Sequence, residues 1–402
     1  MLQDRIHGWL ERRIISRGLP LSICLPDKRL INPHPSPEVT VTLRSPRAWL
    51  ALANPTLGKL AKAYVEQELD VSGNLQDILE IGARFCDSDA GTMKKTSRAW
   101  KWWRHTRAAD RRAIGRHYDV SNDFYALWLD RWRVYSCAYF KTPDDSLDLA
   151  QEQKLDLICH KLNMQEGERF LDIGCGWGGL ILWAAQHYRV RATGITLSQN
   201  QYQYVQEKIA QLGMQDFCQI MRCDYRDLAE SEPYDKIASV GMFEHVGKKN
   251  LPFYFAKIYR LLKPGGLVMN HGITLTLPDT RELGSDVGEF IEQYVFPGGE
   301  LMHVSSVMEE MARQKLDCRD AENLRPHYAK TLWHWVRRLE ARHEEARKLA
   351  GEKVFRTWQI YMGGSARSFE RGWLSIYQLL AGKPLPDGSL AYPLTREFVY
   401  RS

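Results

Sequence analysis

Short apolar runs alternate with longer helical patterns between residues 150 and 270. The runs predict buried parallel strands at Phe170–Ile173, Val190–Ile195, Phe217–Met221, Lys236–Val240 and Leu267–Asn270. A helical pattern over 150–162 precedes the first strand, and others follow over 180–185 and from Thr196 onward. A Lys-Pro-Gly-Gly turn over 263–266 precedes the last strand. This alternation predicts a doubly wound, mainly parallel α/β sheet.

A glycine-rich turn follows the first predicted strand. Asp172 stands near the end of that strand, and the turn contains Gly174, Gly176, Gly178 and Gly179. Such a turn lets backbone N–H groups approach a nucleotide-like ligand, although a tight strand–helix junction alone can also require glycine. Polar residues at later strand ends favour the ligand: Thr196–Ser198, Asp224 and Glu244–His245. Because the carboxyl ends of parallel strands meet at one edge, these residues predict one site.

The first 90 or so residues have a pattern of their own. Alternating segments over 20–25 and 39–43 predict short strands on either side of a proline-rich stretch, and helical patterns follow over 57–69 and 75–85. We therefore expect a small N-terminal α+β domain over 1–92, a linker over 93–116 and a catalytic domain over 117–402.

The predicted linker is basic and rich in tryptophan. Between Lys94 and Arg116, nine Lys and Arg residues accompany one acid, and Trp100, Trp102 and Trp103 lie among them. One interpretation is a solvated helix between domains. The other is an interfacial segment, in which cations meet anionic headgroups and tryptophan settles at headgroup level. No motif that reads nucleic acid accompanies the stretch, so we expect no nucleic-acid partner.

Composition narrows the class of protein. The 402 residues are 44% hydrophobic and 26% charged, which is typical of a globular protein, and the net charge of +6 permits an anionic partner. The eight cysteines include no Cys-x-x-Cys pair, so we expect neither a disulfide framework nor a metal site, but reduced cysteines in a cytoplasmic protein. We also expect no signal peptide and no membrane-spanning helix.

Four longer motifs occur along the chain in this order: His117–Tyr125, Tyr135–Phe140, Ser239–Gly247 and Phe290–Gly299. The turn from Asp172 to Gly178 resembles the first motif of class I S-adenosylmethionine-dependent methyltransferases. Together these stretches resemble the cyclopropane-fatty-acyl-phospholipid synthase family, which is related to the mycolic acid cyclopropane synthases. The likeness covers about 117–380 strongly, and 53–70 is similar to the family's small extra domain. It implies a Rossmann-like, seven-stranded sheet with a helical lid over about 278–365.

The resemblance implies S-adenosylmethionine as the cofactor and assigns residues to it. The glycines would face its methionine part, the stretch after the second strand its ribose, and the end of the third strand its adenine. The implied residues are Tyr135, Ser136, Asp172, Gly174, Gly176, Gly178, Thr196, Leu197, Ser198, Gln201, Asp224 and Tyr225.

The implied reaction adds a methylene group to the cis double bond of an unsaturated phospholipid acyl chain. A double bond is a poor nucleophile, so alignment with a strongly electrophilic methyl is required, and the carbocation that follows requires a closed, apolar pocket. A base must then remove a proton to close the cyclopropane ring. The resemblance implies bound bicarbonate as this base, with ligands from Cys137, Glu244, His271, the backbone of Ile273 and Tyr328. Histidine and tyrosine can donate to an anion, and a glutamic acid can share a proton with it.

Ser365 departs from the family pattern. It stands where such families often carry a cysteine before an Ala-x-x-Phe segment. The implied mechanism needs no protein nucleophile, so we interpret Ser365 as pocket lining. Two alternatives stay open: a fatty-acyl C-methyltransferase with a methyl-branched or methylene-bearing product, and a catalytically lapsed lipid-binding homologue.

The expected partner is a phospholipid bilayer with unsaturated chains, contacted peripherally at the inner face of a bacterial membrane. The small N-terminal domain would mediate a homodimer in the manner of the family.

Overall fold

The computed structural model describes residues 2–31, 34, 36–86, 121–278, 285–295 and 300–400. The chain divides into two compact units, which are considered separately. The smaller contains 1–100, 281–297 and 339–367, and the larger contains 101–280, 298–338 and 368–402. The predicted boundaries at 92 and 116 stay a prediction, and the basic stretch over 94–116 lies outside the described residues.

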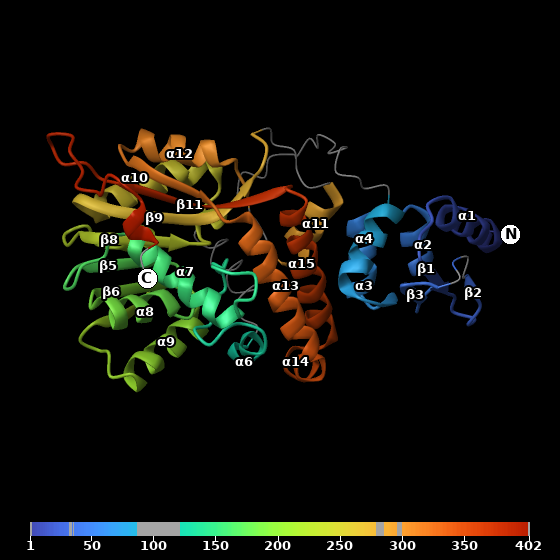
Figure 1. Ribbon diagram of the computed structural model, residues 1–402. Coiled ribbons are helices and arrows are strands. Elements are labelled where there is room, and N and C mark those ends of the chain that lie inside the picture. Colours follow the sequence, from blue (N-terminus) through green and yellow to red (C-terminus); the bar gives the residue numbers. More distant parts are fainter. Residues whose placement is uncertain are drawn as a thin grey trace. The chain divides into compact units, whose positions relative to one another are not determined.

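The larger unit is built on a seven-stranded sheet of order β10-β11-β9-β8-β5-β6-β7 (Figure 1). The strands are β5 (Arg169–Ile173), β6 (Arg191–Thr196), β7 (Cys218–Arg222), β8 (Tyr234–Val240), β9 (Leu262–Leu275), β10 (Asp317–Asn323) and β11 (Leu374–Gly382). Strands β9, β8, β5, β6 and β7 are parallel, whereas β11 and β10 pair antiparallel. The strand order changes direction between β5 and β8, which makes their carboxyl ends the switch point where ligands bind in such sheets. The predicted seven-stranded, mainly parallel α/β fold is confirmed.

Helices cover both faces of this sheet and bury it. The helices α7 (Leu147–Lys161), α8 (Gly179–Tyr188) and α9 (Gln199–Gln211) pack on one face, and α10 (Leu251–Leu261) and α12 (Val304–Arg313) on the other (Figure 1). Helices α7 and α9 each begin at a serine cap, because Ser146 accepts the N–H of Leu149 and Ser198 accepts that of Gln201. The other elements are α6 (Asn122–Ala126), η1 (Tyr225–Asp227), η2 (Phe243–His245), η3 (Lys248–Asn250), η4 (Glu397–Val399) and α13 (Arg325–Ala341), which begins in this unit.

Strand β9 is longer than predicted. The Lys-Pro-Gly-Gly stretch over 263–266 lies inside it, not before it. The register with β8 passes from Tyr234 opposite Leu262 to Lys236 opposite Leu267, so the extra residues form a bulge. Gly265 has φ of 80°, which glycine adopts without strain. A bulge and a turn require the same residue types, and this is why the sequence pattern placed the strand boundary wrongly.

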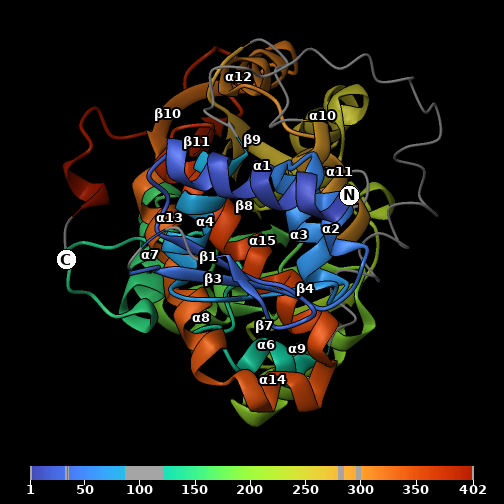
Figure 2. The ribbon, with the colours of Figure 1, turned by 90° about the vertical axis from the view of Figure 1, so that its right-hand side faces the viewer.

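The smaller unit contains a four-stranded sheet of order β2-β1-β3-β4 with helices around it (Figure 2). Its elements are α1 (Leu2–Ser16), β1 (Leu21–Cys24), β2 (Leu30–Ile31), β3 (Val39–Leu43), α2 (Ala48–Ala53), α3 (Leu57–Val65), β4 (Leu69–Ser72), α4 (Leu75–Phe85), α11 (Ser285–Tyr294), α14 (His343–Ala350) and α15 (Glu352–Glu370), which ends beyond the unit. The helix predicted over 57–69 stops at Val65, because Gln67 adopts a left-handed φ of 59° and turns the chain into β4.

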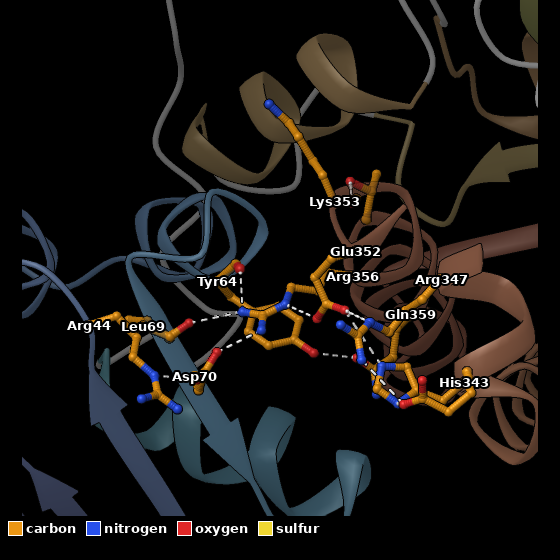
Figure 3. Close-up of polar contacts among 12 residues, drawn as sticks. Arg44, Tyr64, Leu69, Asp70, His343, Arg347, Glu352, Lys353, Arg356 and Gln359 are labelled. Carbon is orange, nitrogen blue, oxygen red and sulfur yellow. Dashed lines mark hydrogen bonds and ion pairs between the residues drawn. The ribbon is translucent and has the colours of Figure 1, made fainter. Parts of the chain in front are cut away.

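Arg356 joins α15 to the small sheet within this unit (Figure 3). Its guanidinium donates to the carboxylate of Asp70 at 2.6 Å and to the carbonyls of Tyr64 at 3.0 Å and Leu69 at 3.2 Å. It also lies over the Tyr64 ring, 4.7 Å from the centroid. A planar guanidinium satisfies this set of acceptors, which a lysine ammonium does not match.

Replacing Arg356 with methionine is therefore expected to lower the free energy of unfolding by about 2 kcal/mol. Methionine keeps the apolar stem but leaves two carbonyls and one oxygen of Asp70 without this donor, while Arg44 still donates to the other oxygen. Urea unfolding measures the change. The matched control is Arg29→Met, since Arg29 pairs with Asp27 on the surface and such pairs contribute little. Equal stabilities of the two variants would contradict this account.

None of the described helices is both long and apolar enough to cross a membrane.

Candidate functional site

A pocket opens at the carboxyl ends of β5, β6 and β8, in the larger unit. Most of the predicted cofactor-binding residues line it, namely Tyr135, Ser136, Asp172, Gly174, Gly176, Thr196, Leu197, Gln201, Asp224 and Tyr225. Gly178 and Ser198 were predicted with them but are not among the lining residues. Strand ends far apart in sequence therefore meet at one site.

Gly178 does not line the pocket but allows the glycine turn to pack closely against α9. Its φ is 81°, and a Cβ added there would lie 2.9 Å from a methyl carbon of Val205 on α9. Glycine is required for both reasons. Ser198 likewise has a structural role, because its side chain caps the N-terminus of α9. These two residues hold the loops that carry the pocket wall.

Hydrogen bonds fix the loop after β6. The Thr196 hydroxyl donates to Oε1 of Gln201 at 2.7 Å and accepts the N–H of Ser198 at 3.2 Å. At the end of β7, the buried Asp224 carboxylate accepts from the guanidinium of Arg226 at 2.6 Å. Polar groups are thus held in place at the two strand ends that we predicted to face ribose and adenine.

Lys154 is a lining residue that the sequence analysis missed. It comes from α7, is buried, and donates to the Ser136 hydroxyl at 2.8 Å. Burial lowers the pKa of Lys154 to about 8, against the attraction of Asp130 and other acids. Burial also raises the pKa of Asp172 to about 7, against the attraction of Lys154. A lysine inside a helical apolar pattern usually indicates a solvated face, so the pattern gave no signal of a pocket.

Arg133 is a second lining residue that was missed. Its guanidinium lies over the ring of Tyr204, 4.2 Å from the centroid, and its Nη1 is buried with no hydrogen-bond partner among the described residues. The next residue, Val134, packs against the first turn of α8, because a Cβ on Gly179 would lie 2.8 Å from a Val134 methyl. The Arg133 guanidinium and the first turn of α8 therefore line the same pocket, and both favour a negative charge there.

Glu244 and Ile273 are in contact. Oε1 of Glu244 accepts the backbone N–H of Ile273 at 2.7 Å, and Oε2 is buried with no partner among the described residues. Burial raises the pKa of Glu244 to about 7, although the Ile273 N–H favours the ionised form. His271 stands two residues earlier on β9, and its Nε2 is likewise buried without a partner among them. Burial, together with the charges of Lys154 and Lys161, lowers the pKa of His271 well below its usual value, so the ring is neutral.

Cys137 lies against α13, the helix that carries Tyr328. The Cys137 sulfur is 3.8 Å from the carbonyl of Leu324, and the N–H of Ala138 donates to the Thr331 hydroxyl at 3.0 Å. Tyr328 is one turn before Thr331, and its ring packs against Phe369. Burial raises the pKa of the Cys137 thiol, which stays protonated. Cys137, Glu244, His271, Ile273 and Tyr328 belong to the larger unit but are not among the residues lining the pocket.

Ser365 belongs to the smaller unit, on α15. Its predicted place in the pocket lining stays a prediction. The predicted roles of the other site residues also stay predictions, although the structure gives each of them a position.

The pKa of Glu244 predicts a pH dependence of stability. The folded state holds the proton more tightly than the unfolded chain, whose carboxyl keeps its ordinary pKa of 4.5. Stability from this group is fully present below about pH 4.5 and is lost as the pH rises through about 7, by about 3 kcal/mol in all. Glu244→Gln removes this proton but keeps an acceptor for Ile273. Urea unfolding from pH 4.5 to 7.5 is therefore expected to show a flatter profile for the variant, and parallel profiles would contradict the assignment.

The fold and the glycine-lined pocket define a class I S-adenosylmethionine-dependent methyltransferase. The family model for mycolic acid cyclopropane synthetase matches residues 105–379. The chain belongs to this family.

Curated relatives and solved structures agree with the assignment. A probable fatty acid methyltransferase of Pseudomonas putida is 42% identical over 391 residues, covering 96% of this chain and 98% of the relative. The cyclopropane synthase MmaA2 of Mycobacterium tuberculosis is 33% identical with a TM-score of 0.65, covering 68% of this chain and 98% of that one. Mycolic acid cyclopropane synthase CmaA1, solved with SAH and CTAB, is 34% identical with a TM-score of 0.64 and the same coverage.

Proposed function

We propose that this enzyme adds a methylene group from S-adenosylmethionine across the cis double bond of an unsaturated phospholipid acyl chain. The observation that carries the proposal is the pair of buried atoms without partners among the described residues, Glu244 Oε2 and His271 Nε2, in the same unit as the cofactor pocket. A buried polar atom without a partner requires an explanation, and a bound group would supply the missing hydrogen bonds.

The residues around these atoms suit a small anion such as bicarbonate. A neutral His271 donates from one ring nitrogen, and a protonated Glu244 donates from Oε2 while Oε1 keeps its bond to Ile273. The carboxyl pKa near 7 lets Glu244 hold or release this proton at neutral pH. These residues fit bicarbonate without a further charge from the protein.

When bound, S-adenosylmethionine supplies an electrophilic methyl and bicarbonate supplies a base. The chain's own residues orient and shield the reactants. Gly174 and Gly176 have φ of 81° and 55°, and such turns expose backbone N–H groups to the methionine part. Tyr135 lines the pocket and packs with Trp128 and Trp335, with ring centroids 5.3–5.5 Å apart. We assign to this aromatic cluster the exclusion of water from a cationic intermediate.

A second candidate is a fatty-acyl C-methyltransferase that stops at a methyl-branched or methylene-bearing chain. The high identity to a probable fatty acid methyltransferase favours it. The two reactions share the cofactor and the first bond formed, and they differ in the loss of a proton that closes the ring. The presence of all the proposed bicarbonate ligands favours ring closure.

We further propose that the lipid is reached by peripheral contact with a bilayer, and that the chain forms a homodimer. The basic composition supports contact with anionic headgroups.

Transfer of labelled methyl from S-adenosylmethionine tests the reaction class. The purified protein is incubated with bicarbonate and with vesicles whose chains are either cis-monounsaturated or saturated, and with RNA in parallel. Label is expected in the unsaturated lipid. Label in RNA would contradict the proposal. Absence of label from both lipids and from RNA, in a protein that binds SAH, would contradict it too.

Arg133→Gln is expected to weaken SAH binding roughly 10- to 100-fold, because we assign the guanidinium to the amino-acid carboxylate of the cofactor. Calorimetry with SAH and with its decarboxylated analogue separates this contact from general damage. The analogue is expected to bind both proteins alike. Arg131→Gln is the matched control, since Arg131 pairs with Glu152 outside the pocket. An equal loss for both ligands would contradict the assignment.

A further inference from the structure

Three adjacent strands place polar side chains in a row across the sheet of the larger unit. Glu322 on β10 lies opposite Gln378 on β11, and Gln378 lies opposite His271 on β9. Opposed residues of antiparallel strands point to the same face. Lys161, the last residue of α7, reaches this row from the helix and ion-pairs with Glu322. Lys161, Gln378 and His271 are all buried.

The chemistry of the donors fixes the orientation of the Gln378 amide. Nζ of Lys161 lies 2.9 Å from Oε1 of Gln378, and an ammonium only donates, so the amide oxygen must face it. The amide nitrogen then faces Nδ1 of His271 at 3.2 Å. Because an amide nitrogen also only donates, Nδ1 must accept, and the proton of the neutral ring lies on Nε2.

The charges around Lys161 keep this arrangement in place. Glu322 contacts the ammonium directly, and Asp320 lies 3.4 Å from it. A buried ammonium with carboxylate partners stays paired, and its third contact holds the Gln378 oxygen. Lys161 therefore fixes the orientation of the Gln378 amide, and Gln378 in turn fixes which nitrogen of His271 carries the proton.

We propose that Gln378 and Lys161 are positioning residues that hold His271 in the Nε2–H tautomer, so that Nε2 donates a hydrogen bond to the bound anion. The identity of that anion rests on the proposed function. The tautomer follows from the contacts alone. Nε2 is the buried ring atom without a hydrogen-bond partner among the described residues, and a protonated nitrogen there suits an anion and repels a cation.

Nuclear magnetic resonance of the whole protein with 15N-labelled histidine tests the tautomer. Correlation of ring nitrogens with carbon-bound protons distinguishes the two forms, and the His271 signals are assigned by their loss in His271→Asn. The expected result is a protonated Nε2 and a bare Nδ1 at neutral pH. In Gln378→Glu, the carboxylate accepts from the ring, so the proton is expected to move to Nδ1. Gln378→Met, which removes both hydrogen bonds, is expected to abolish the preference. A wild-type ring protonated on Nδ1, or a Gln378→Glu ring still protonated on Nε2, would overturn the proposal.

A second readout links the tautomer to the anion. The bicarbonate concentration for half-maximal turnover is expected to rise roughly 10- to 100-fold in Gln378→Glu, while the dissociation constant for SAH stays unchanged. A reversed tautomer with an unchanged bicarbonate requirement would overturn the role of Nε2 at the anion. If the wild type transfers no methyl to lipid, the proposed function fails, and the resonance experiment still decides the tautomer.

Discussion

Glu244→Gln is expected to lower turnover by roughly 10²- to 10⁴-fold, the usual contribution of a residue that positions or transfers a proton. Glutamine still accepts the Ile273 N–H, so the change removes the ionisable oxygen and little else. Steady-state methyl transfer to unsaturated lipid measures the effect. SAH affinity is expected to stay as in the wild type, because Glu244 is not among the residues lining the cofactor pocket.

Glu309→Gln serves as the control for this prediction, since Glu309 pairs with Arg313 on the surface. Turnover of the Glu244 variant within a few-fold of the control would contradict the role of Glu244. A parallel loss of SAH affinity would assign Glu244 to the cofactor instead.

Gly272→Ala is expected to destabilise the larger unit by about 3 kcal/mol and to abolish turnover. Gly272 lies between His271 and Ile273 on β9, and a Cβ there would stand 2.0 Å from Cε1 of Phe243 and 2.9 Å from Oε1 of Glu244. The ring and the carboxylate must both move, so the bond from Ile273 to Glu244 is lost. Thermal unfolding and methyl transfer measure the two effects.

A smaller side chain at position 243 tests whether the destabilisation of Gly272→Ala comes from the clash with the Phe243 ring. The double variant Gly272→Ala with Phe243→Leu is expected to recover part of the stability, because the nearest clash is with the ring. Gly364→Ala is the control, since nothing lies within 4 Å of a Cβ there. A destabilisation equal to that of Gly364→Ala would show that the site tolerates a side chain at residue 272.

The sequence was sufficient to predict the strand ends that form the cofactor pocket. Buried parallel strands appear as short apolar runs, and the polar residues that follow them must meet at one edge, as Asp172, Thr196 and Asp224 do. Strand β10 was not located in this way. It is polar along most of its length, because it is an edge strand, and no apolar run marks it.

The sequence pattern did not predict which polar side chains are buried. Lys154, Lys161 and Gln378 are polar residues in a helix and a strand, where a solvated face is the usual interpretation. Only the packing of α7 against the sheet shows that they are buried and paired. Glu244 was also marked by its place at a strand end, but His271, Ile273, Cys137 and Tyr328 were identified only through resemblance to a family. Their spacing along the chain does not reveal that β9, η2 and α13 are brought into one unit.

The most direct test of the proposed reaction uses S-adenosylmethionine with a trideuterated methyl group. The protein is incubated with cis-monounsaturated phospholipid vesicles and bicarbonate, and the acyl chains are analysed by mass spectrometry and by their reactivity as olefins. Ring closure removes one deuteron, so the account predicts chains that gain CD2 and lose the double bond. Chains that retain all three deuterons, or that gain CD2 and remain olefins, would contradict cyclopropane formation.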